Sequence, residues 1–160
     1  MAEIVIAEEP ADSDDVRWCF EQYYAELDRR FGTGFDVDAT LPLRVDELTP
    51  PRGVVLMARE GGQPVGCGGV KLVEPRIGEI KRMWVSQRVR GRGLGGRILT
   101  ALEARAVEAG KTVARLETNR SLSEAIAMYR KRGYREVTPF NDEQYGDHWF
   151  EKDLTASEGL

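Results

Sequence analysis

Hydrophobic and polar positions change their spacing several times along the chain, and each change predicts a different element. Apolar residues that alternate with polar ones predict strands at residues 4–6, 54–59, 65–73, 79–85, 113–118, 134–137 and 148–154. Helical spacing predicts helices at residues 12–30, 94–109 and 123–132. Residues 31–49 contain glycine and proline and are predicted as loop with one short helix. The predicted order is strand, helix, three-stranded antiparallel meander, helix, strand, helix and two closing strands.

Three glycines, Gly66, Gly68 and Gly69, interrupt the middle strand of the meander. A glycine inside a strand often marks a bulge or a close approach of another backbone. We therefore expect one of these two features at this point of the sheet.

The length and composition of the chain set the broad class of protein. A chain of 160 residues suits one domain, spanning 1–160, with residues 154–160 as a frayed tail. No apolar run approaches the roughly 18 residues that a membrane span needs, and the N-terminus has no basic, apolar leader. These features predict a soluble, cytoplasmic protein with no membrane partner.

Charge and metal-binding residue types exclude two further classes. The formal net charge of -4 argues against a nucleic-acid partner. Cys19, Cys67 and the single His148 lack the spacing of a metal site, which predicts no metal and two reduced thiols. Basic residues nevertheless crowd positions 81–97, which favours a local anion site in an acidic protein.

The basic segment contains a glycine-rich loop between a predicted strand and a predicted helix. Its sequence is Val85-Ser86-Gln87-Arg88-Val89-Arg90-Gly91-Arg92-Gly93-Leu94-Gly95-Gly96-Arg97. Glycines let backbone N–H groups converge, and a helix start adds unpaired N–H groups and the positive end of the helix dipole. Arg90 and Arg92 add positive charge, so the loop is predicted to bind a pyrophosphate.

Two other nucleotide-binding loops have glycines at comparable spacing. A P-loop requires Lys followed by Ser or Thr after the glycines, and that pair is absent here. The dinucleotide pattern is met by Gly91, Gly93 and Gly96, but that loop follows the first strand of a parallel sheet rather than an antiparallel meander. A dinucleotide-binding enzyme therefore remains the weaker alternative.

The same residues resemble the coenzyme loop of the GNAT acetyltransferases, which has Arg or Gln, two residues, Gly, one residue, then Gly or Ala. The pattern occurs twice, in the overlapping segments Arg88-Val89-Arg90-Gly91-Arg92-Gly93 and Arg90-Gly91-Arg92-Gly93-Leu94-Gly95. Met83-Trp84-Val85 resembles the family's preceding strand, and residues 125–134 resemble its later helix ending in Gly and an aromatic. The resemblance covers about residues 54–154.

This resemblance implies a fold, a cosubstrate and a set of binding residues. The fold is mixed α/β, with a mostly antiparallel, centrally splayed sheet and helices on both faces. The strand ending at Val85 would separate from the 113–118 strand, and the pantetheine arm of acetyl-CoA would lie in the gap. The coenzyme-binding residues would be Met83, Trp84, Val85, Arg88, Arg90, Gly91, Arg92, Gly93, Leu94, Gly95, Gly96, Asn119 and Tyr129.

The family pattern also implies two candidate catalytic groups. Tyr129 matches the family tyrosine near the coenzyme sulfur, where it would protonate the departing thiolate. Alternatively, it is a core tyrosine of an amphipathic helix. Glu79 is the candidate base for the acceptor ammonium, with Glu117 as the second candidate. Glu79 could instead pair only with Lys81 or Arg82 at a strand edge.

Three features of the sequence leave the site less defined. Many family members have Asn three residues before the position of Ala125, where this chain has Leu122, and nearby Asn119 is out of register. Residues 145–150 either line the acceptor pocket or end the last hairpin, the latter being favoured for Trp149 and Phe150. His148 is a conceivable base without supporting residues.

The sequence leaves the acceptor open within one chemical class. We expect direct transfer of an acetyl group to a primary amine of a small molecule or peptide. A catalytically silent acyl-CoA sensor is the alternative, and a homodimer is compatible with the resemblance. Acidic residues near the expected acceptor end would suit a cationic amine, although a solvated acidic face explains them equally; they are Asp12, Asp14, Asp15, Asp36, Asp38, Asp46 and Glu47.

Overall fold

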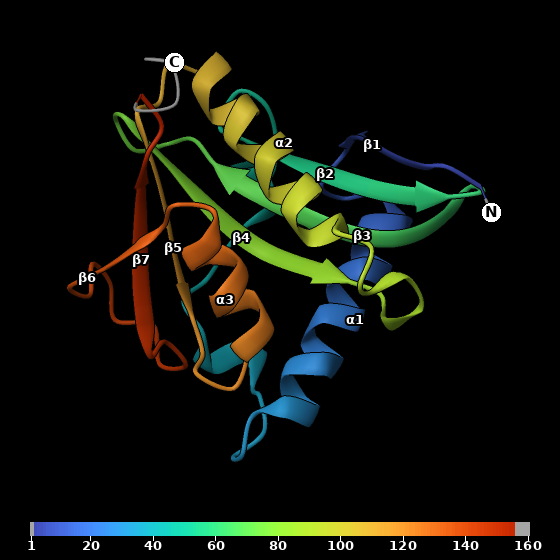
Figure 1. Ribbon diagram of the computed structural model, residues 1–160, viewed down its shortest axis with the longest axis horizontal. Coiled ribbons are helices and arrows are strands. Elements are labelled where there is room, and N and C mark those ends of the chain that lie inside the picture. The colour runs from blue at the N-terminus through green and yellow to red at the C-terminus, as the bar shows by residue number, and fades with distance from the viewer. Residues whose placement is uncertain (1, 156–160) are drawn as a thin grey trace.

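The computed structural model of the protein describes residues 2–155, and its strands form one seven-stranded sheet with helices on both faces (Figure 1). The strands are β1 Ile4–Glu9, β2 Gly53–Glu60, β3 Gln63–Lys71, β4 Ile77–Val85, β5 Val113–Thr118, β6 Arg135–Val137 and β7 His148–Asp153. The helices are α1 Asp14–Arg30, α2 Leu94–Glu108 and α3 Ser123–Lys131, with 3-10 turns at Val37–Ala39, Val45–Leu48 and Gln87–Val89. Within the predicted tail, residues 156–160 lie outside the described residues.

The predicted fold class and element order are confirmed. The strand order in the sheet is β1-β2-β3-β4-β5-β7-β6, and every neighbouring pair except β4 and β5 is antiparallel. The main difference lies in residues 31–49, where two 3-10 turns replace the single short helix that was predicted. Both turns start after an extended residue, at Asp36 and Arg44.

Strand β2 shows how the sheet gains an apolar layer on each side. Alternate residues point to opposite faces of a strand, so Val54 and Leu56 pack in the cluster formed with α2 and α3. Val55 and Met57 pack instead against α1. Each fully buried side chain of this size contributes roughly 1.5–3 kcal/mol relative to an exposed one. The two layers fix α1 on one face and α2 with α3 on the other.

The glycines of β3 allow α2 to pack unusually close to the sheet. A Cβ at Gly68 would lie 2.9 Å from Leu102 Cδ1, and one at Gly66 would lie 3.0 Å from Ile98 Cδ1. The pairing of β3 with β4 also shifts here, because Cys67 pairs with Trp84 while Gly69 pairs with Lys81. The expected bulge is therefore confirmed, and the close approach at these glycines is made by side chains of α2 rather than by another backbone.

The splay at the centre of the sheet is also present. Strands β4 and β5 run parallel and pair only from Ile77 with Val113 to Glu79 with Arg115. Past these residues the two strands have no further ladder pairs, although β4 continues to Val85. Backbone groups on the facing edges are then available to an extended ligand. In Figure 1, α3 lies beside β5, and the end of β4 leads into the loop before α2.

Candidate active site

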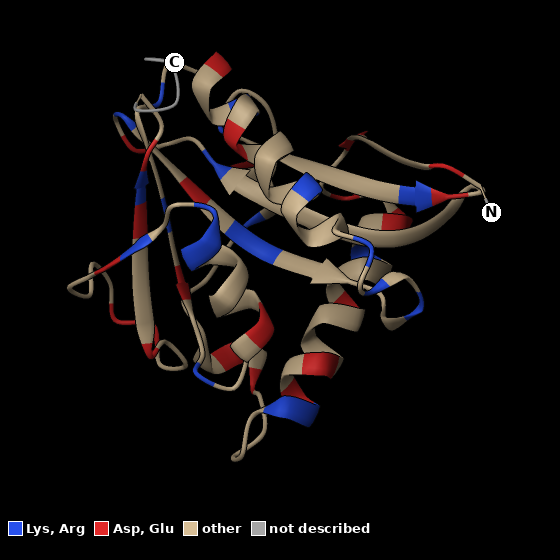
Figure 2. Ribbon diagram, in the orientation of Figure 1, with Lys and Arg blue, Asp and Glu red and all other residues tan. Residues whose placement is uncertain are grey.

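The loop between β4 and α2 presents a row of backbone amides to solvent. Gly91 and Gly93 have φ angles of 80° and 75°, which lie in the left-handed region that favours glycine. Gly93 is the N-cap of α2, and the first amide bonded inside the helix is that of Arg97, which donates to the Gly93 carbonyl at 3.2 Å. Among the described residues, the amides of residues 91–96 have no protein acceptor. Figure 2 shows basic residues along this loop, so the loop has the geometry and charge of an anion site.

A groove of about 920 Å³ extends from this loop along β4 to α3. Most of the predicted coenzyme residues line it: Met83, Trp84, Val85, Arg90, Gly91, Gly93, Leu94, Gly95, Gly96 and Tyr129. The groove is therefore continuous between the glycine-rich loop and the candidate general acid.

Three predicted coenzyme residues lie outside this groove. Arg88 and Arg92 turn toward the β2–β3 hairpin, where both pair with Glu60, at 3.7 and 2.8 Å. Asn119 lines a second cavity instead, and its Nδ2 donates to the Tyr145 carbonyl at 2.9 Å. The sequence motif could not reveal this, because a glycine loop fixes the path of the backbone and leaves the direction of long side chains to their carboxylate partners.

The groove also contains a chain of ion pairs that joins three elements. Arg90 donates to the Val85 carbonyl at 3.0 and 3.2 Å and forms an ion pair with Glu26 on α1. Glu26 in turn pairs with Arg30 at 3.5 Å, and Arg30 pairs with Glu124 on α3 at 2.7 Å. The side chain of Arg90 is thus held at the end of β4 by α1.

A second cavity, of about 330 Å³, lies on the other side of the splay. The residues that line both it and the groove are Tyr23, Leu27, Met83, Leu122, Ala125 and Tyr129. A shared wall of this kind means that a ligand in the groove and a ligand in the cavity can meet at these residues. Leu122, where many family members have Asn, is one of them.

Tyr129 lies at this junction with only 7% of its surface exposed. Its ring packs against those of Tyr134 and Phe150, at centroid distances of 5.8 and 6.2 Å. Burial raises the pKa of Tyr129 above its usual value, and the charge of Glu117 raises it further. The phenol is therefore neutral at physiological pH and can act as a hydrogen-bond donor.

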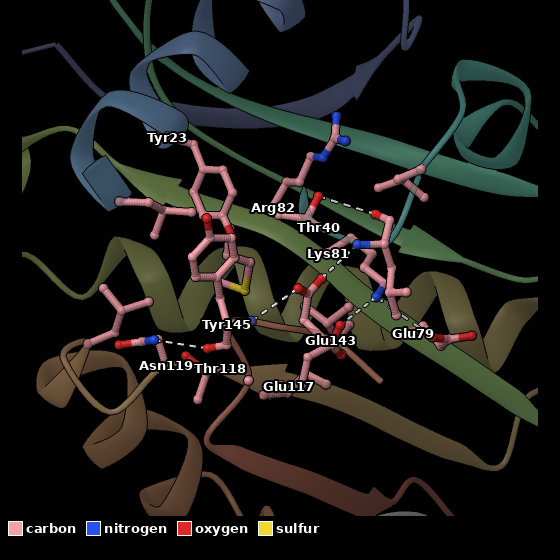
Figure 3. Close-up of a pocket in the computed structure, with 18 of the residues that line it drawn as sticks. Tyr23, Thr40, Glu79, Lys81, Arg82, Glu117, Thr118, Asn119, Glu143 and Tyr145 are labelled. Carbon is pink, nitrogen blue, oxygen red and sulfur yellow. Dashed lines mark hydrogen bonds and ion pairs between the residues drawn. The ribbon is translucent and has the colours of Figure 1, made fainter. Parts of the chain in front are cut away.

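Charged side chains from the splayed strands meet in the second cavity (Figure 3). Glu79 pairs with Arg115 at 3.3 Å and with Lys81 at 3.8 Å, while Lys81 pairs with Glu117 at 3.0 Å. Glu79 is 7% exposed and lies on a central strand, so the expected position at a strand edge is wrong. Of the two alternative partners, Lys81 is confirmed, and Arg115 is a further partner that the sequence did not indicate.

Some residues of the closing hairpin line the second cavity, and others lie outside it. Tyr145 lines the cavity. His148 lines neither space and pairs through Nδ1 with Glu136 at 2.7 Å. Trp149 donates from Nε1 to Asn141 Oδ1 at 3.0 Å. His148 is therefore not part of the wall that the groove and the cavity share.

Two residues of the site, Tyr23 and Arg82, could not be found by sequence reasoning. Tyr23 reaches the junction from α1, and burial raises its pKa as it does that of Tyr129. Arg82 lines the second cavity and has a φ of 54°. Neither residue lies in a recognisable sequence motif. Their positions depend on the docking of α1 and on the bulge in β4, and both of these arise from tertiary packing.

Metal-binding and membrane-spanning features are absent from the described residues. Within residues 2–155, no group of three or more His, Cys, Asp or Glu side chains could hold a metal ion. No helix in that range is both long and apolar enough to cross a membrane. Cys19 and Cys67 are buried free thiols, and neither lines the groove or the cavity.

Comparisons with known proteins agree with this geometry. An IAA acetyltransferase of Azospirillum brasilense is 36% identical over 141 residues, which cover 88% of this chain and 90% of that protein. A GNAT-family acetyltransferase of Staphylococcus aureus Mu50 has the same fold, with a TM-score of 0.78 at 16% identity, over 95% of this chain and 99% of that one. The fold is also shared with the PaiA N-acetyltransferase of Thermoplasma acidophilum, solved in complex with coenzyme A, at a TM-score of 0.70, 14% identity, and 94% and 99% coverage. The family model described as Acetyltransferase (GNAT) family matches residues 14–134, and the chain belongs to this family of acyltransferases.

Proposed function

We propose that the protein is an acetyl-CoA-dependent N-acetyltransferase that moves an acetyl group directly to a primary amine of a small molecule or peptide. The observation that carries this proposal is the junction at Tyr129, where the groove that starts at the glycine loop meets a separate cavity. A donor site and an acceptor site that share one wall are what a direct transfer between two bound substrates requires.

The groove suits the donor at both of its ends. Acetyl-CoA supplies the acetyl group as an activated thioester. The unpaired amides of residues 91–96 would bind its diphosphate, since a Cβ on Gly91 or Gly93 would meet nothing within 4 Å and both glycines leave the loop open. The unpaired edge of β4 beyond Glu79 would bind the amides of the pantetheine arm.

Tyr129 and Glu79 are the candidate acid and base of the reaction. The neutral phenol of Tyr129 would donate to the coenzyme sulfur as negative charge develops there. Glu79 would take the proton of the acceptor ammonium, directly or through water, from its position in the cavity wall. Glu117 lines the same cavity and is the second candidate for this role.

Direct transfer is favoured over a covalent acyl-enzyme. A thiol that carries the acetyl group would have to reach both ligands. Cys19 and Cys67 are both 0% exposed and pack in the layer between α1 and the sheet. Their positions leave the amine itself as the nucleophile.

Release of free thiol from acetyl-CoA, measured with a panel of amines, tests the proposal. Amine-dependent release together with formation of the N-acetylated amine, identified by mass spectrometry, would support it. Tight coenzyme binding without release for any amine would instead favour the silent sensor.

A further inference from the structure

The charges of the acceptor cavity are almost all paired within the protein. Four basic and three acidic side chains line it. Lys81 and Arg115 pair with Glu117 and Glu79 as described, and Lys71 pairs with Glu47 at 3.1 Å. The exception among the basic residues is Arg82, for which the described residues provide no ion pair and no hydrogen bond to the guanidinium.

Arg82 is fixed in this position by its backbone and by α1. Its φ of 54° is uncommon for a residue with a side chain, and the bulge places Arg82 and Met83 together opposite Gly68. The guanidinium lies 4.9 Å from the ring centroid of Phe20 and 5.3 Å from that of Tyr24. Figure 3 shows it directed away from the carboxylates of Glu79 and Glu117.

Ring contacts hold the cation and leave its hydrogen-bonding capacity unused. A guanidinium carries five N–H donors in a planar fork that matches a carboxylate. Stacking on aromatic faces partly stabilises the positive charge, but it gives the N–H donors no hydrogen-bond acceptor. A half-buried arginine held in this way is suited to a ligand that supplies acceptor oxygens.

The acidic residues expected near the acceptor do not provide a competing cation site. All seven lie in the described part of the chain, and none of them lines the cavity. Asp46 pairs with Arg44 and Arg52, and Asp15 pairs with Arg59. The prediction of an acidic acceptor surface is therefore not supported. The cavity itself is lined by more basic than acidic side chains.

We propose that Arg82 binds a carboxylate of the acceptor, so that the acceptor is an amine that also carries a carboxylate, as an amino acid does. This inference rests on the proposed acetyltransferase function. The apolar part of the acceptor would lie against the rings of Tyr24, Phe31, Phe35 and Tyr145, which line the same cavity and contact one another. Arg82 is then a specificity-determining residue, and its neighbour Met83 reaches the junction with the donor groove.

Matched pairs of amines test this inference. Each pair consists of an amino acid and the amine that remains without its carboxylate, such as phenylalanine with phenethylamine and leucine with 3-methylbutylamine. We expect wild-type kcat/KM to be about 10- to 100-fold higher for the member with the carboxylate, the range of one charge-assisted hydrogen-bonded pair. Equal or higher kcat/KM for the members without it would overturn the inference while acetyltransferase activity stands.

Substitutions at Arg82 assign the preference to this residue. Arg82→Gln should lower the ratio of kcat/KM between the two members of a pair to near one, and Arg82→Lys should keep part of it. The ratio does not depend on the folded fraction, since both substrates meet the same preparation. Arg76→Gln is the matched control, because Arg76 also has a left-handed φ, of 66°, but lines neither the groove nor the cavity. An unchanged ratio in Arg82→Gln would contradict the role.

A calorimetric titration with acetyl-CoA separates the two possible failures. Acetyl-CoA binding without turnover of any amino acid in a panel of the twenty common ones would overturn the acceptor class and leave the donor site in place. Absence of acetyl-CoA binding would contradict the proposed function itself, and the inference with it.

Discussion

Lys81 Nζ lies 3.0 Å from Glu117 Oε1, joining β4 to β5 just past the last pair of residues in their ladder. The ladder ends at Glu79 and Arg115, whose side chains also form an ion pair, at 3.3 Å. Ionic contacts therefore hold the strands together where backbone hydrogen bonds stop. The same four side chains form part of the wall of the second cavity, the proposed acceptor site.

Removing the cation of this contact should destabilise the fold. Lys81→Met leaves Glu117 and Glu79, whose side chains are both 9% exposed, without their shared partner. We expect a loss of about 1–3 kcal/mol in the free energy of unfolding, measured with urea. The double variant Lys81→Met with Glu117→Gln should lose less than the sum of the single changes, and additive losses would show that the pair is not coupled.

Loss of the Tyr129 hydroxyl should lower turnover more than coenzyme affinity. Tyr129→Phe keeps the buried ring and removes the donor, so we expect kcat to fall roughly 100-fold with nearly unchanged affinity for acetyl-CoA. Tyr134→Phe is the matched control, because its hydroxyl donates to Glu103 at 2.7 Å and lines neither the groove nor the cavity. Wild-type turnover in Tyr129→Phe would remove the phenol from the reaction.

The pH dependence of kcat should reflect a phenol that stays protonated. Burial raises the pKa of Tyr129 above the reference value of about 10, so its neutral form persists as pH rises. We expect no decline of kcat from Tyr129 ionisation up to roughly pH 10. An alkaline limb below about pH 9 that disappears in Tyr129→Phe would contradict the raised pKa.

Local patterns were sufficient for most of the fold. The strand Val113–Thr118 was predicted with its observed bounds because apolar and polar residues alternate from Ala114 to Glu117, and α2 starts at Leu94 as the glycine loop indicated. The predicted splay and its groove followed from the family pattern rather than from the residues themselves. The pattern of apolar and polar residues therefore predicted the helices and strands. The family resemblance predicted the splay between the two central strands.

Long-range pairing explains what could not be predicted. Alternation placed Glu79 on a strand face but could not show that Arg115, on a strand far along the chain, would be its partner. Arg88 and Arg92 were expected at the phosphate because they lie in the motif, yet Glu60 holds both. The ion-pair partners of these side chains come close only in the folded structure. A position in the motif therefore does not determine which way a side chain points.

Removal of the Glu26 charge should strengthen coenzyme binding. Glu26 lines the proposed donor groove and pairs with Arg90, so its charge would repel a bound polyanion while it holds a cation of the loop. We expect Glu26→Gln to bind acetyl-CoA about 2- to 10-fold more tightly at low salt, with a smaller effect at high salt. Glu21→Gln, on the exposed side of α1, is the control. Weaker binding in Glu26→Gln would indicate that Glu26 supports the loop instead.

Calorimetric titration of two glycine variants with acetyl-CoA examines the donor site itself. Gly93 and Gly110 flank α2 and have φ angles of 75° and 82°, and a Cβ on either would meet no atom within 4 Å, so substitution strains both alike. Gly93→Glu should abolish acetyl-CoA binding, because its carboxylate would enter the phosphate site, whereas Gly110→Glu should bind like the wild type. Wild-type affinity in Gly93→Glu would show that the amides of residues 91–96 do not bind the diphosphate.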